Sequence, residues 1–197
     1  MRIKYNAPTV LTFTFISAAV LLFNMIFPRA FLTQTWFMVP GRGGFHADNL
    51  RSWITLFTHV VGHADLNHFL SNFALILLLG PILEETYGSL SLLLMMVITA
   101  VVTGALNVFF FPTYLLGASG VVFMMILLAS FTNFTKGEIP LTFILVMLLY
   151  LGREFFNSFK SDNISEFAHI VGGFCGSLFG FFRPGKAPSK LPLGGKE

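Results

Sequence analysis

Residues 114–124 read Tyr-Leu-Leu-Gly-Ala-Ser-Gly-Val-Val-Phe-Met, which places one serine between two glycines at the start of an apolar run. A hydroxyl in such surroundings costs free energy unless it is hydrogen-bonded or used chemically. A serine at the start of a helix is most often a helix cap, and that interpretation suits Ser119 taken alone. The alternative is that Ser119 is a nucleophile, which the other helices activate and shield from lipid.

The composition indicates an all-α integral membrane protein. Of 197 residues, 55% are hydrophobic and 11% are charged, whereas a soluble domain carries about 25% charged residues. Five or six spans of ~20 residues would use most of the chain. The net charge of +3 does not indicate nucleic-acid binding, because the basic residues form no stripe. The single cysteine, Cys175, excludes an internal disulfide.

The apolar runs predict a bundle of six spans. Their expected bounds are 10–27, 66–83, 90–110, 116–132, 139–156 and 166–182. The first run is expected to be a span and not a cleavable signal, because it is long and lacks a small-residue cleavage site. We expect residues 1–9 to be a cytoplasmic N-terminus, 10–182 the six-span domain, and 183–197 a basic, disordered cytoplasmic tail. The distribution of Lys and Arg favours this orientation.

The segment 28–65, between the first two spans, is the only long external loop in this topology. Its many aromatic residues, among them Trp36 and Trp53, predict a folded element that lies partly in the membrane interface. The fourth span follows Phe111-Pro112 without a polar linker. We therefore expect its helix to begin below the membrane surface, with Ser119 submerged.

Four polar side chains lie near the starts of three spans. His68 and Asn72 are spaced i, i+4 on the second span, Ser119 is on the fourth, and His169 is on the sixth. With the amino terminus inside, these spans all begin at the outer face. Topology alone therefore predicts that the four side chains meet at one depth in the outer half of the bilayer.

This set predicts a serine nucleophile with a histidine base. His169 can take the proton of Ser119, and a helix start supplies N–H groups and a favourable dipole for a developing oxyanion. His68 and Asn72 could add side-chain donors. The only nearby acid, Glu166, is expected at the surface, which favours a Ser–His dyad over a triad.

Other interpretations of these residues remain open. A histidine in a span can be structural, and Asn72 can hydrogen-bond between helices. We expect His59 and His63 to be structural hydrogen-bonding groups at the loop–helix junction. A metal site is disfavoured, because no single helix face presents three of its candidate ligands. Those candidates are His59, His63, Asp65 and His68.

Three motifs together resemble those of the rhomboid family of intramembrane serine proteases. Gly117-Ala118-Ser119-Gly120 resembles the nucleophile motif G-x-S-G, and residues 68–72 resemble H-x-x-x-N. Residues 168–176 resemble the sixth-helix motif A-H-x-x-G-x-x-x-G. The family's pattern at the inner end of helix two is matched by Gly80, Glu84 and Gly88.

The resemblance implies a six-helix rhomboid-like core in which Ser119 attacks a peptide carbonyl and His169 is the general base. It implies an oxyanion hole made by the Ser119 N–H, His68 and Asn72. It also implies substrates that are single-span or polytopic membrane proteins in the lipid bilayer, with no cofactor and no metal. The minimal six-span build and the short ends separately lead us to expect a bacterial inner membrane, with an organelle membrane as the alternative and the site opening to the outer face. The Trp-Arg pair that several bacterial members carry in the first external loop is not clearly present.

Glycines and one aromatic residue are expected to support the site. Gly117 on span four, with Gly172 and Gly176 on span six, should let the two helices approach closely, and Gly120 completes the motif. Phe123, where the family often has Tyr, is expected to stack on the His169 ring. Candidates for a lateral gate and cap are Phe155, Phe156 and the segment 157–165.

Two other functions compete with the protease. A catalytically silent rhomboid-like protein would bind or escort membrane-protein clients, but such relatives lose the serine or the histidine, and this chain has both Ser119 and His169. A transporter or channel would need polar residues along a whole path. The inner half of the predicted bundle is apolar, which disfavours that class.

Overall fold

The computed structural model describes residues 3–28, 31–131, 141–142, 144–146, 148–149 and 166–182. The elements named within these ranges are all α-helices, as the sequence predicted. They are α1 (Pro8–Ile26), α2 (Leu32–Trp36), α3 (Leu50–Thr58), α4 (Leu66–Tyr87), α5 (Ser89–Phe110), α6 (Ser119–Ala129) and α8 (Glu166–Phe182).

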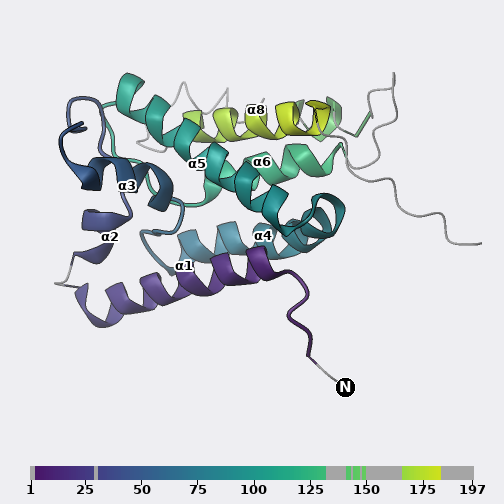
Figure 1. The fold of residues 1–197 in the computed structure, drawn as a ribbon, viewed down its shortest axis with the longest axis horizontal. Helices are drawn as coiled ribbons and strands as arrows, with labels where there is room; N and C mark the ends of the chain where they lie inside the picture. Colours follow the sequence, from purple (N-terminus) through teal and green to yellow (C-terminus); the bar gives the residue numbers. More distant parts are fainter. Residues whose placement is uncertain are drawn as a thin grey trace, which may run out of the picture.

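The short helix α6 lies at the centre of the bundle. It packs against α4, α5 and α8, and the α6–α8 contact is the most extensive between any two helices described. Figure 1 shows α6 and α8 side by side, α1 along α4, and α2 and α3 together at one end. Residues 120–128 are all buried, which fits a helix enclosed by other helices.

Three of the described helices, α1, α4 and α5, are long and apolar enough to cross a membrane. They match the first three predicted spans. The helix α6 has 11 residues, and at 1.5 Å per residue it covers roughly 16 Å of an about 30 Å hydrocarbon core. It begins at Ser119 and not at residue 116, because Gly117 has φ +109°, outside the helical region.

The six-span count stays a prediction. The sixth predicted span matches α8, and the described residues between 141 and 149 are helical. Most of the predicted fifth span lies outside the described residues. The same holds for the gate and cap candidates, Phe155, Phe156 and the segment 157–165, and for the tail 183–197.

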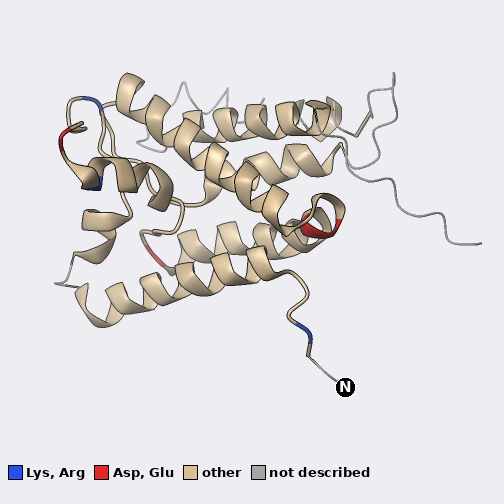
Figure 2. Cartoon of the chain, viewed as in Figure 1, with Lys and Arg blue, Asp and Glu red and all other residues tan. Residues whose placement is uncertain are grey.

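Charged residues avoid the middle of the bundle. In Figure 2 the blue and red segments lie in loops and at helix ends, while the central turns of the helices are tan. Among the described charged residues the buried exception is Glu84, near the end of α4. This distribution is what a bilayer requires of a helical membrane protein.

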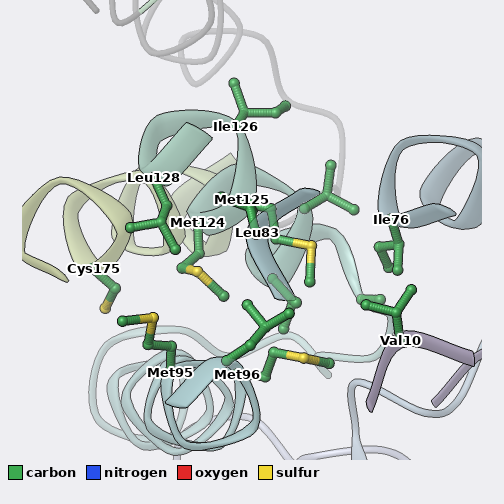
Figure 3. Close-up of a cluster of buried hydrophobic side chains, with 14 of the residues drawn as sticks. Val10, Ile76, Leu83, Met95, Met96, Met124, Met125, Ile126, Leu128 and Cys175 are labelled. Carbon is green, nitrogen blue, oxygen red and sulfur yellow. The ribbon is translucent and has the colours of Figure 1, made fainter. Parts of the chain in front are cut away.

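The core around the middle of α6 is rich in sulfur. Figure 3 shows Met95 and Met96 from α5, Met124 and Met125 from α6, and Cys175 from α8. All five side chains are buried. Methionine is unbranched and adaptable, so these side chains can fill the irregular space where three helices meet.

The helices α6 and α8 meet backbone to backbone. A Cβ on Gly172 would lie 2.0 Å from the Gly120 carbonyl oxygen, and one on Gly176 would lie 2.2 Å from the Met124 oxygen. The four-residue step on both helices keeps the contact in register over one turn. The predicted packing role of Gly172 and Gly176 is therefore confirmed.

The predicted helix-packing role of Gly117 was wrong. This residue precedes α6, and a Cβ on it would lie 2.6 Å from the His68 ring. Its positive φ is one that glycine adopts readily and other residues avoid. Gly117 thus lets the loop turn past His68, while Gly120 makes the contact with α8 that we had expected of Gly117.

Glu84 joins α4 to the start of α1. Its carboxylate accepts hydrogen bonds from the backbone N–H groups of Thr9 at 2.9 Å and Val10 at 3.1 Å. These N–H groups belong to the first turn of α1 and have no partner within that helix. Glu84 therefore caps a helix that is 74 residues away in sequence.

Glu84→Gln should lower the unfolding temperature in detergent, because an amide offers one accepting oxygen where the carboxylate uses two. We expect a loss of about 1–3 kcal/mol, the cost of a buried donor left unsatisfied. Glu85→Gln, at the neighbouring exposed position, is the matched control and should unfold like wild type. Equal unfolding temperatures for the two variants would contradict the capping role.

Candidate active site

A cavity of about 620 Å³ lies where the starts of α4, α6 and α8 meet. Its lining includes every side chain that the sequence placed at a common depth, and Phe123 as well. Those residues are His68, Asn72, Ser119, Phe123 and His169. The predicted convergence of the three helix starts is therefore observed.

Ser119 is the first residue of α6 and does not cap it. The N-cap is Ala118, and no side chain makes a cap hydrogen bond there. The structure thus contradicts the interpretation of Ser119 as a helix cap. The first N–H groups of α6, including that of Ser119, lack partners within the helix and carry the positive end of its dipole. The hydroxyl of the half-buried Ser119 therefore lies beside N–H groups that can donate hydrogen bonds to an anion.

The His169 ring stacks on Phe123. The ring centroids are 4.4 Å apart and the planes are within 3° of parallel. Both residues line the cavity, and Phe123 lies one turn after Ser119. The stacking that the sequence predicted is therefore observed. It restricts rotation of the imidazole and holds its plane at the wall of the cavity that contains Ser119.

His68 and Asn72 face the same cavity from α4. The Asn72 amide donates to the His68 carbonyl oxygen at 3.0 Å, which is a bond within the helix and not the interhelical bond considered from the sequence. An amide nitrogen carries two hydrogens, so this bond engages one of them. Asp65 caps α4 by accepting from the His68 N–H at 2.8 Å.

The loop that leads to Ser119 is braced by the segment between α1 and α4. Leu115 and Val39 exchange two backbone hydrogen bonds, of 2.9 and 3.0 Å. The Gly117 N–H donates to the His59 carbonyl oxygen at 2.9 Å. A Cβ on Gly41 would lie 2.2 Å from the Pro112 oxygen, so this contact requires glycine. Sequence reasoning missed this bracing: Gly41 is a sequence signal for the contact with Pro112, whereas the backbone hydrogen bonds leave none.

His63 supports Ala118, the residue before Ser119. Its Nε2 accepts from the Ala118 N–H at 3.4 Å, and its Nδ1 lies 3.1 Å from the Val61 carbonyl oxygen. A neutral ring fits both bonds, with the proton on Nδ1 donated to Val61. The ring also packs edge-on against His68, with centroids 5.0 Å apart. The expectation that His63 is a structural hydrogen-bonding group is confirmed, and it satisfies one N–H at the start of α6.

Burial holds both loop histidines in the neutral form. Burial lowers the pKa of His59 to about 4, and its Nδ1 lies 3.2 Å from the Leu56 carbonyl oxygen. Burial, and then the nearby His68, lower the pKa of His63 to about 4. The second ring nitrogen of His59 lies 3.5 Å from the Thr103 hydroxyl. The ring nitrogens of His59 thus face Leu56 and Thr103, whereas those of His63 face Val61 and Ala118.

These pKa values predict a loss of stability in mild acid. The unfolded chain takes up protons near pH 6.5 and the folded chain only near pH 4, so stability falls as the pH falls between these values. Unfolding temperatures in detergent at pH 7.5, 6, 5 and 4.5 should show this decline. His63→Gln, whose amide can still accept from Ala118, should have a shallower decline. Identical pH profiles for His63→Gln and wild type would refute the assignment to His63.

Comparison with known proteins identifies the family of this chain. The family profile described as Rhomboid domain matches residues 50–185. The chain is 25% identical over 127 residues to the rhomboid protease GlpG of Haemophilus influenzae. That match covers 63% of this chain and 66% of the relative, just under two thirds of its length. The profile match covers more than half of the chain, and the chain belongs to the rhomboid family.

Proposed function

We propose that this protein is an intramembrane serine endopeptidase in which Ser119 is the nucleophile and His169 the general base. The observation that carries the proposal is the shared cavity, where side chains from α4, α6 and α8 meet at the start of a buried helix. Family membership supports the same activity class. The stacking of His169 on Phe123 supports a dyad, because the base is oriented by packing.

The proposed reaction begins when a peptide carbonyl of the substrate enters the cavity. His169 takes the Ser119 proton as the serine oxygen bonds to the carbonyl carbon. The C–N bond then breaks, His169 gives that proton to the leaving amine, and an acyl-enzyme ester remains. Water, activated by His169, hydrolyses the ester and restores the serine.

The oxyanion of each tetrahedral intermediate is proposed to accept hydrogen bonds from the Ser119 N–H, His68 and Asn72. The helix start contributes an N–H that is fixed before the reaction and a dipole of favourable sign. Asn72 can donate its second amide hydrogen while the first stays bonded to the His68 carbonyl. The braced loop before α6 would keep the Ser119 N–H in place, since Gly117 and Ala118 are bonded to His59 and His63.

The proposed substrates are single-span or polytopic membrane proteins. A carbonyl within an α-helix already accepts a hydrogen bond from the N–H four residues on, and side chains shield it. Attack therefore requires local unwinding, which favours substrate helices that contain residues of low helix propensity. We propose a six-span bundle in a bacterial inner membrane, with both termini cytoplasmic and the cavity opening to the outer face.

Ser119→Ala and His169→Ala should each reduce cleavage of a transmembrane substrate in proteoliposomes by about 10⁶-fold. The double variant should cleave no more slowly than either single variant, because the two residues act as a unit. Ser130→Ala removes a hydroxyl from the other end of α6, where it donates to the Ile126 carbonyl oxygen. This control should cleave at the wild-type rate.

Near-normal turnover by folded Ser119→Ala would refute the protease assignment. Substrate capture without cleavage, by wild type and by Ser119→Ala alike, would instead support the silent, client-binding alternative. Unfolding temperatures of all variants separate loss of chemistry from loss of fold.

A further inference from the structure

A second cavity, of about 470 Å³, adjoins the proposed active site. It lies between the end of α1, α2 and the start of α4, and it shares three residues with the first cavity. These are Ala64, Asp65 and Leu116. Leu116 is three residues before Ser119, so these two residues lie at most about 10 Å apart, a separation that three residues of an extended peptide can span.

The walls of the second cavity are mainly apolar, with side chains such as Leu21, Met25 and Met38. Two of its polar side chains already bond to each other, because Asn24 contacts both the hydroxyl and the backbone N–H of Thr33. His63 is engaged with Ala118. The exposed polar side chains that line it are Gln34 and Asp65.

Among the described residues that line either cavity, Asp65 carries the only carboxylate, and none of these residues is a Lys or Arg. One of its oxygens caps α4 through the His68 N–H. A carboxylate has two oxygens and about four acceptor positions, so the cap leaves most of its accepting capacity. The wall between the cavities therefore presents a negative charge without a cation on the described lining.

We propose that Asp65 selects substrates with a lysine or arginine about three to five residues from the scissile bond, held in the second cavity. This inference rests on the proposed function and specifies the substrate for the same site. The apolar walls suit the methylene stem of such a side chain, while Asp65 and Gln34 at the rim accept from its charged end. A neutral chain of equal length would fill the walls but give the Asp65 carboxylate no partner beyond the His68 N–H.

Binding to the Ser119→Ala protein tests this separately from catalysis. Two series of transmembrane peptides would carry lysine or methionine at each position from two to six residues on either side of the scissile bond. At one position we expect the lysine peptide to bind about tenfold tighter. Asp65→Asn, which keeps the helix cap because Asn caps as well as Asp, should abolish that difference. Asp48→Asn, an exposed loop carboxylate that lines neither cavity, should retain it.

The proposal is overturned if lysine and methionine peptides bind equally at every position, if neither series binds, or if the preference survives Asp65→Asn. Cleavage assays with wild type then report on the proposed function independently. A lysine preference in binding without any cleavage would refute the protease and leave the role of Asp65 standing. Cleavage without a lysine preference would support the protease and refute the role of Asp65.

Discussion

The backbone contact between Gly120 and Gly172 sets the geometry on which the proposed site depends. No side chain fits there, since a Cβ on Gly172 would lie 2.0 Å from the Gly120 oxygen. Gly120 follows Ser119 directly, and Gly172 lies three residues after His169, so the contact brings the two proposed catalytic residues to the same level. Phe123 then reaches the His169 ring and stacks on it at 4.4 Å.

A second constraint acts on the loop before α6. Backbone bonds from Val39 and His59, and the neutral ring of His63, hold residues 115–118. The segment between α1 and α4 thus positions the start of a helix that is more than 50 residues further along the chain. Burial lowers the pKa of His63 to about 4. The imidazole therefore stays neutral, and its Nε2 can accept the hydrogen bond from the Ala118 N–H. The same segment forms part of the wall between the two cavities.

The features that could be predicted from sequence are those that require a particular type of residue at a position. The polar residues at three helix starts, the glycines of α8 and the stacking partner Phe123 all have this property. The bracing of the loop by Val39 and His59 could not be predicted, because backbone bonds do not depend on side-chain identity. Gly117 was misassigned because two features favour glycine, close helix packing and a positive φ, and the sequence does not distinguish them.

The central claim is that Ser119 is activated by His169, and covalent labelling tests it most directly. Detergent-solubilised protein would be treated with a fluorophosphonate and the adduct located by peptide mass spectrometry. The account predicts one adduct, on Ser119, that is lost in His169→Ala although the variant remains folded. An adduct on Ser71, the other serine among the described residues of the cavity, or undiminished labelling in His169→Ala, would contradict it.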